Sequence, residues 1–238
     1  MFRKSGIKKH YLLISSITVL VLTPATIAAG IVFFNDRKYY FISLMLIIYA
    51  VLLMVLKWEG KKPKARELVV IATLIAIAVA GRTLFYAVPF FKPVSAIIIV
   101  SAIAFGENVG FLTGMGSILI SNFFFGQGPW TPWQMFAFGV IGYLTGLLYR
   151  KKLIKRSRIF LTIYGFVVTI VIYGGIMNPA ALIIYSSEIT MEGLLAVYIS
   201  GFPVDAVHGL STALFLFVGA KPLFEKLDRI KEKYGILL

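Results

Sequence analysis

The chain has no cysteine, only two histidines and only ten acidic residues among 238. Without cysteine it can form neither disulfide bridges nor thiolate metal sites. Two histidines and no carboxylate cluster predict no metal site and no cofactor held by the chain itself. A phosphate-binding Gly-x4-Gly-Lys-Ser/Thr loop is also absent, so we do not expect ATP hydrolysis by that route. Zinc-protease and nucleophile-elbow motifs are missing too, which argues against an enzyme.

Apolar residues dominate what is present. They make up 59% of the chain, and the mean hydropathy is +0.90. A soluble domain has about 45–50% apolar residues, so most of this surface is expected to face lipid. The net charge of +14 would suit nucleic acid, but the basic residues lie in short clusters between apolar runs. This distribution is typical of membrane topology signals, and it predicts no nucleic-acid partner.

Eight apolar runs predict an all-α, polytopic membrane bundle. The runs are 11–34, 40–56, 68–88, 94–105, 109–125, 133–149, 159–183 and 202–220. A helix needs about 20 apolar residues to span a bilayer, so 94–105 and 109–125 are short. Merging them into one span would move the basic cluster after residue 149 to the outer side, against the positive-inside bias. We therefore predict eight helices.

Twenty of the 24 basic residues then lie on one side of the membrane. They occupy four segments: 3–9, 57–66, 150–158 and 221–233. The positive-inside rule makes this the cytoplasmic side of the cell membrane and places both termini there.

The chain divides into two parts at the basic linker near residue 64. Residues 1–64 are predicted to form an accessory two-helix hairpin and the linker, because these spans carry few polar groups away from their ends. Residues 65–238 are predicted to form a six-helix core, where glycine pairs, intramembrane charges and unusual loops occur. We expect the core to bind its ligand without residues 1–58.

Small residues recur at helical spacing in three of the core helices. They are Ala72, Ala76 and Ala80, then Gly110 and Gly114, then Gly142 and Gly146. Such stripes let helices approach closely in lipid, where no hydrophobic force drives association. The alanine stripe fits either an ordinary contact within the chain or a docking face for another subunit.

Arg82, Asp205 and His208 are polar groups inside predicted spans. A charge at mid-membrane costs roughly 2.5–3.5 kcal/mol, so each residue needs a partner. Arg82 has three possible roles, which are reaching the outer interface, pairing with Asp205 and holding a ligand. Asp205 and His208 lie three residues apart on one helical face. They would be the acid and base if the chain were a small intramembrane enzyme.

The segment from Asn122 to Gln134 is predicted to be an outer loop rich in aromatic and amide groups. Its tryptophans suit either an interfacial aromatic belt or a ligand site. Amides beside aromatic rings fit a large, mainly neutral ligand with a flat ring system. The predicted ligand-binding residues of the whole chain are Arg82, Tyr86, Lys92, Asn122, Gln127, Trp130, Trp133, Gln134, Asn178, Tyr185, Asp205 and His208.

Several of these segments together resemble a known family, the substrate-binding S components of energy-coupling factor (ECF) vitamin transporters. The resemblance covers roughly residues 65–235. It depends on the alanine-spaced first core helix ending in Ala-Gly-Arg82, the Phe-Lys-Pro turn at 91–93, and the segment Gly-Pro-Trp-Thr-Pro-Trp-Gln at 128–134. The last span, which begins Gly-Phe-Pro-Val-Asp-Ala-Val-His at 201–208, fits the same family.

The resemblance implies a six-helix protein that captures a vitamin on the outer side of the membrane. It also implies partners, namely a transmembrane scaffold subunit and two cytoplasmic ATPases that consume the ATP. By the same resemblance, Ala72, Ala76 and Ala80 would contact the scaffold.

The tryptophan-rich segment and the extra hairpin look most like the cobalamin-specific branch, so cobalamin (vitamin B12) is the expected ligand. Another ring-bearing vitamin or precursor is the alternative within the family. A small intramembrane enzyme and a facilitator that works without ATPases are the alternatives outside it.

Overall fold

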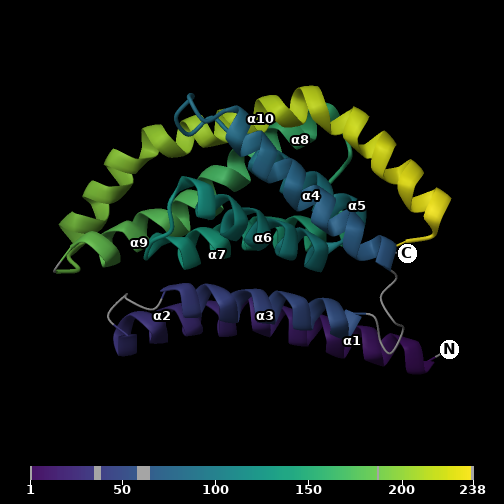
Figure 1. Ribbon diagram of the computed structural model, residues 1–238, viewed down its shortest axis with the longest axis horizontal. Coiled ribbons are helices and arrows are strands. Elements are labelled where there is room, and N and C mark those ends of the chain that lie inside the picture. Colours follow the sequence, from purple (N-terminus) through teal and green to yellow (C-terminus); the bar gives the residue numbers. More distant parts are fainter. Residues whose placement is uncertain (1, 35–38, 58–64, 187, 237–238) are drawn as a thin grey trace.

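The structure is a computed structural model, and it describes residues 2–34, 39–57, 65–186 and 188–236. These residues form eight continuous helical segments and no strand (Figure 1). The predicted all-α bundle, with a six-helix core after an N-terminal hairpin, is confirmed.

The hairpin comes first in the chain and the core follows. The hairpin comprises α1 (Phe2–Ile17), the π-helical turn η1 (Thr18–Leu22), α2 (Thr23–Phe34) and α3 (Tyr39–Lys57). The core comprises α4 (Ala65–Leu84), α5 (Val94–Phe105), α6 (Glu107–Phe125), α7 (Trp130–Arg150), α8 (Arg158–Val168), η2 (Thr169–Gly174), α9 (Gly175–Tyr185) and α10 (Met191–Tyr234). The π-turns join α1 to α2 and α8 to α9 without a break.

Five helices in the described ranges are long and apolar enough to cross a membrane. They are His10–Gly30, Ala65–Leu84, Glu107–Phe125, Arg158–Tyr185 and Met191–Tyr234. Helix α5 is shorter, and all twelve of its residues are buried, so it fills the centre of the bundle. A helix that is apolar on nearly all sides is expected in such a place.

Helix α10 corrects the predicted last span. The prediction was 202–220, but the helix runs for 44 residues and extends beyond that range at both ends. It contains Pro203 and Pro222, and each lacks the N–H that continues the helical ladder. Proline is the usual cause of helix bending, and α10 arches over one side of the core (Figure 1).

The predicted glycine stripes on α6 and α7 face each other at the centre of the core. A methyl group added to Gly110 would lie 2.7 Å from the carbonyl oxygen of Gly142, and one added to Gly114 would lie 2.8 Å from the backbone nitrogen of Gly139. Only glycine allows two helix backbones to come this close. The pair α6–α7 is therefore the most closely packed helix pair of the core.

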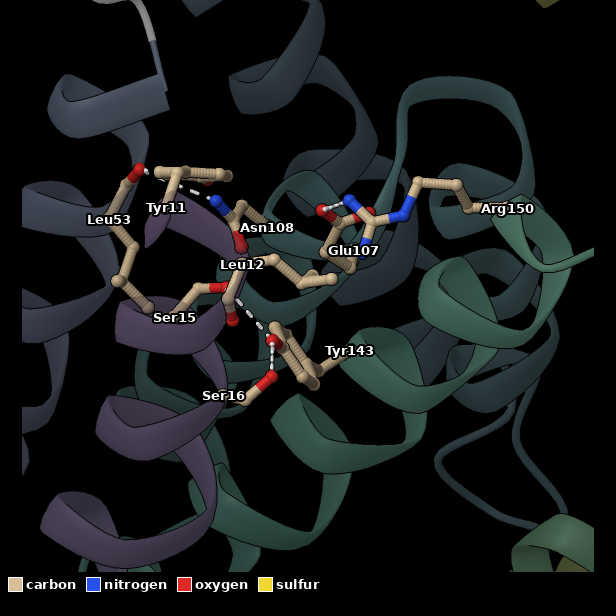
Figure 2. A network of polar contacts seen from close by, with 9 residues as sticks. All are labelled: Tyr11, Leu12, Ser15, Ser16, Leu53, Glu107, Asn108, Tyr143 and Arg150. Atoms are coloured by element: carbon tan, nitrogen blue, oxygen red, sulfur yellow. Dashed lines mark hydrogen bonds and ion pairs between the residues drawn. The ribbon is translucent and has the colours of Figure 1, made fainter. Parts of the chain in front are cut away.

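The hairpin packs against the faces of α6 and α7 that point away from the rest of the core (Figure 1). Its contact with the core includes polar groups as well as apolar ones. The hydroxyl of Tyr143 on α7 lies 2.9 Å from both Ser15 Oγ and Ser16 Oγ of α1 (Figure 2). Tyr143 and Ser15 are fully buried, so these hydroxyls satisfy one another away from water.

A second polar contact lies one turn away. The carbonyl oxygen of Leu53 on α3 accepts hydrogen bonds of 3.3 Å from Tyr11 Oη and from Asn108 Nδ2 of α6 (Figure 2). Beside it, Glu107 pairs with Arg150 across 2.7 Å. The hairpin thus has a defined register on the core. These contacts were not predicted, because the hairpin spans carry few polar groups away from their ends.

Candidate substrate-binding site

A cavity of about 270 Å³ opens at the end of α4, between the α4–α5 turn and helices α6, α7 and α10. Its wall combines polar and aromatic groups. The lining residues are Arg82, Tyr86, Pro89, Phe90, Lys92, Val94, Ser95, Ile118, Phe125, Gln134, Phe138, Tyr173 and His208. A cavity with a few polar groups on an apolar wall is the usual form of a small-molecule site.

Arg82 lies in the last turn of α4, at the edge of this cavity. Its Nη1 donates hydrogen bonds to Ser121 Oγ at 2.5 Å and to Asn122 Oδ1 at 2.7 Å, both on α6. The guanidinium also lies 4.9 Å from the centre of the Phe125 ring, a cation–π distance. The partners of this arginine within the described ranges are thus neutral, and Nε and Nη2 make no hydrogen bond to them.

Asn122 connects Arg82 to the start of α7. Its amide nitrogen donates to Thr131 Oγ1 at 3.2 Å and to Gln134 Oε1 at 3.0 Å. Asn122 itself is 1% exposed and does not line the cavity. It therefore orients two lining side chains, Arg82 and Gln134, rather than lining the cavity itself.

Asp205 is hydrogen-bonded to a residue other than Arg82. Its Oδ2 accepts a hydrogen bond of 2.8 Å from Asn178 Nδ2 on α9, and the carboxylate is 4% exposed. No ion pair joins it to Arg82 in the described part of the chain. Of the roles considered for Arg82, a direct pair with Asp205 is the one that this geometry disfavours.

The turn between α4 and α5 is held by Lys92. Its ammonium donates to the carbonyl oxygens of Phe85, Tyr86 and Val88, the last at 2.6 Å. Burial and the neighbouring charge of Arg82 lower the pKa of Lys92. Phe90 in this turn has φ +58°, a conformation that is strained for a bulky residue and typical of ligand clamps.

His208 reaches the cavity from α10 among aromatic rings. Tyr173 lies 4.7 Å away, Phe138 6.3 Å and Phe90 6.4 Å, measured between ring centres, and all three meet His208 edge to face. Its Nδ1 is buried and has no hydrogen-bond partner among the described residues. A buried polar atom of this kind is costly unless a ligand satisfies it.

Five of the twelve predicted ligand-binding residues line the cavity: Arg82, Tyr86, Lys92, Gln134 and His208. Asn122, Asn178 and Asp205 form the supporting contacts described above. Like those three, the remaining four lie outside the cavity wall: Gln127, Trp130, Trp133 and Tyr185.

Each of these four residues has its own environment away from the cavity. Gln127 donates to the carbonyl oxygen of Leu119 at 3.1 Å, Trp130 packs over Gly128, and Trp133 packs on the apolar core. Tyr185 is 72% exposed at the end of α9. The predicted loop 122–134 is itself mostly helical, because α6 continues to Phe125 and α7 begins at Trp130.

Several lining residues were not predicted, chiefly Phe125, Phe138 and Tyr173. They look like ordinary apolar helix positions, and only the crossing of α6, α7 and η2 brings them to one cavity. A signal for Tyr173 was present, because it is an aromatic residue with a polar tip in the middle of a span.

The alanine stripe lies on the open face of α4. Ala72, Ala76 and Ala80 are exposed, whereas Ala78 is buried. The stripe lines an apolar groove of about 540 Å³ between α4 and the end of α6. No described helix covers this groove, so the stripe is exposed on the surface of the described bundle.

Comparison with known proteins identifies the family of this chain. The family model for the S component of ECF-type riboflavin transporters matches residues 62–228, which is most of the chain. The protein belongs to this family. It is therefore a multi-pass membrane protein of a transporter family, and this family is not one of enzymes.

Individual relatives are distant. A UPF0397 protein of Vibrio atlanticus (strain LGP32) is 27% identical over 48% of this chain and 66% of its own length. A UPF0397 protein of Aliivibrio fischeri (strain MJ11) is 30% identical over 40% of this chain and 52% of its own length. The chain thus spans about half to two thirds of the curated relatives that it matches. No solved structure matches it.

Proposed function

We propose that this chain is the substrate-binding subunit of an ECF-type importer and captures a flat, ring-bearing vitamin in the cavity at the end of α4. The observation that carries this proposal is the cavity itself. There, an arginine and a buried imidazole nitrogen meet aromatic rings, and the described residues offer no acidic partner to the arginine and no hydrogen-bond partner to the nitrogen. Family membership supports the same function.

The proposed ligand has about the size of a flavin. A volume of about 270 Å³ is just below the usual range of about 300–1,000 Å³ for small-molecule sites. A corrinoid is far larger than a flavin and would require the cavity to open widely. The expected preference for cobalamin finds no support in the family description, which names riboflavin, or in Trp130 and Trp133, which lie outside the cavity wall.

The proposed orientation places the cavity on the outer side. Helix α4 begins, α7 ends and α10 ends at one end of the bundle (Figure 1). The basic segments that the structure describes lie there, including Arg66 and Lys226. The positive-inside rule makes this the cytoplasmic end. Arg82 and the cavity lie at the opposite end of α4, from which an external ligand would enter.

The proposed partners are a transmembrane scaffold subunit and two ATPases. The exposed stripe of Ala72, Ala76 and Ala80 provides a flat face for the scaffold, because small side chains let a second helix approach closely. The enzyme alternative gains no support from the geometry, since Asp205 is bonded to Asn178 and no described hydrogen bond joins it to His208.

Vitamin uptake tests the proposal. Cells that express this chain with an ECF scaffold and its ATPases are expected to accumulate labelled riboflavin or a related ring-bearing vitamin. Cells that express the chain alone are expected to accumulate none. Uptake by the chain alone would favour the facilitator alternative, and no uptake of any ring-bearing vitamin with a functional ECF module would contradict the proposal.

A further inference from the structure

We infer that the cavity recognises a ligand that carries an ionised acidic group, a phosphate or a carboxylate, in addition to its ring system. This inference rests on the proposed function and narrows its substrate class. Riboflavin itself has no such group, whereas its 5′-phosphate does.

The charges on the cavity wall are the first argument. Arg82 and Lys92 both line the cavity, and no aspartate or glutamate does so among the described lining residues. Asp205, the buried acid nearest in sequence to His208, is bonded to Asn178 and is not part of the wall. The cavity is therefore positively charged when empty. A positive charge held partly away from water is stabilised by an anion that replaces its lost hydration.

The donors left open are the second argument. Arg82 uses Nη1 for Ser121 and Asn122, and its Nε and Nη2 have no described partner. Those two nitrogens form the edge of the guanidinium fork that binds a carboxylate or phosphate with two parallel hydrogen bonds. The contacts of Nη1 with α6 fix the fork in place before a ligand arrives.

Lys92 and His208 complete the site in different ways. The ammonium of Lys92 is occupied by carbonyl oxygens of the turn, so it contributes its charge and the shape of the turn rather than free donors. His208 Nδ1 is buried without a described partner, and as an N–H it would donate to the anion. The rings of Phe138 and Tyr173 pack beside His208 and leave an apolar wall for the ring of the ligand.

The test compares ligands that differ only in the acidic group. Calorimetry on the purified full chain would use riboflavin against riboflavin 5′-phosphate for a phosphate. It would use biotinamide against biotin and nicotinamide against nicotinate for a carboxylate. In the pair that binds, the acid is expected to bind at least about tenfold more tightly, because a hydrogen bond to a charged group contributes about 1.5–3 kcal/mol.

Charge variants connect this preference to the named residues. Arg82→Gln is expected to reduce the preference to about twofold or less, whereas Arg82→Lys keeps the charge and is expected to keep part of it. Lys92→Gln is expected to reduce it less than Arg82→Gln. Arg66→Gln is the matched control, because Arg66 lies at the other end of α4, and it is expected to change nothing.

Each outcome decides the inference. Equal binding of acid and neutral partner in every pair would overturn it while leaving the proposed function intact. An acid preference that survives Arg82→Gln and Lys92→Gln would overturn the assignment of the residues. Binding of no compound would overturn the proposed function as well. If Arg82→Gln does not fold, the ligand pairs on the unaltered chain still decide.

Discussion

Arg82 and Asn122 are joined by a hydrogen bond of 2.7 Å that ties the end of α4 to the end of α6. The same asparagine donates to Gln134 on α7, so one buried amide sets the positions of two cavity side chains. Asp205 has a separate partner, Asn178. Arg82 and Asp205 thus belong to different hydrogen-bonded groups.

This separation predicts independent effects of Arg82 and Asp205 on ligand affinity. Arg82→Gln is expected to weaken binding at least about tenfold, since a charged hydrogen bond contributes about 1.5–3 kcal/mol. Asp205→Asn is expected to act separately, because the two residues share no described hydrogen-bond partner. In the double variant the changes in binding free energy, measured by calorimetry, should add within about 0.5 kcal/mol. A coupling above about 1 kcal/mol would show that the two residues form a pair.

The buried hydroxyl of Tyr143 predicts how firmly the hairpin is attached. Tyr143→Phe leaves Ser15 and Ser16 without this partner. Hydrogen bonds between membrane helices contribute about 0.6 kcal/mol on average and up to about 1.7, so a loss in that range is expected in detergent unfolding. Tyr185→Phe, at an exposed position, serves as the control and should change stability little. Equal stability of Tyr143→Phe and the unaltered chain would contradict the contact.

The contact between Gly110 and Gly142 predicts a strong effect of one methyl group. Gly110→Ala would place it 2.7 Å from the carbonyl oxygen of Gly142, so α6 and α7 must separate. Overpacking of this kind costs about 1–3 kcal/mol, which a thermal unfolding assay in detergent can measure. Gly219→Ala is the matched control, because nothing lies within 4 Å of its added methyl. It should be neutral or slightly stabilising, as alanine favours the helix. Equal melting temperatures of Gly110→Ala and Gly219→Ala would contradict the close approach of the α6 and α7 backbones.

The exposed stripe on α4 predicts a variant that separates binding from transport. Ala76→Leu enlarges a side chain on the open groove without touching the cavity. Ligand affinity of the isolated chain is therefore expected to stay within about twofold, while co-purification with the scaffold and vitamin uptake are lost. The control is Ala196→Leu, at an exposed position on α10. Normal uptake by Ala76→Leu would show that the scaffold docks elsewhere.

The sequence predicted the helices well because apolar runs and basic clusters are local signals. Each of the eight helical segments corresponds to one of the eight predicted runs. The short α5 was predicted as a separate helix because merging it with the next run would have placed the basic cluster after residue 149 on the outer side of the membrane. The last helix differed most from its prediction, because its C-terminal end is polar and Pro203 lies inside it. The first helix also begins earlier than predicted, at Phe2 rather than at residue 11. Hydropathy alone does not show that a helix continues beyond the membrane.

The lining of the cavity was predicted only in part, because it depends on which helices cross. Arg82 and His208 are conspicuous in a span, whereas Phe138 and Tyr173 are not. The partner of Arg82 was missed because Asn122 was assigned to a loop, although α6 extends through it. The contact between Ser16 and Tyr143 joins residues 127 positions apart, and a single hydroxyl gives no long-range signal. That the core binds ligand without residues 1–58 stays a prediction, supported by the absence of described hairpin residues from the cavity wall.

Calorimetric titration of the purified chain in detergent, without scaffold or ATPases, tests the central claim most directly. The account expects saturable binding of one riboflavin, or of its 5′-phosphate, per chain, and a marked loss in Arg82→Gln. A well-folded chain that shows no saturable binding of either flavin, or of any other ring-bearing vitamin, would contradict it.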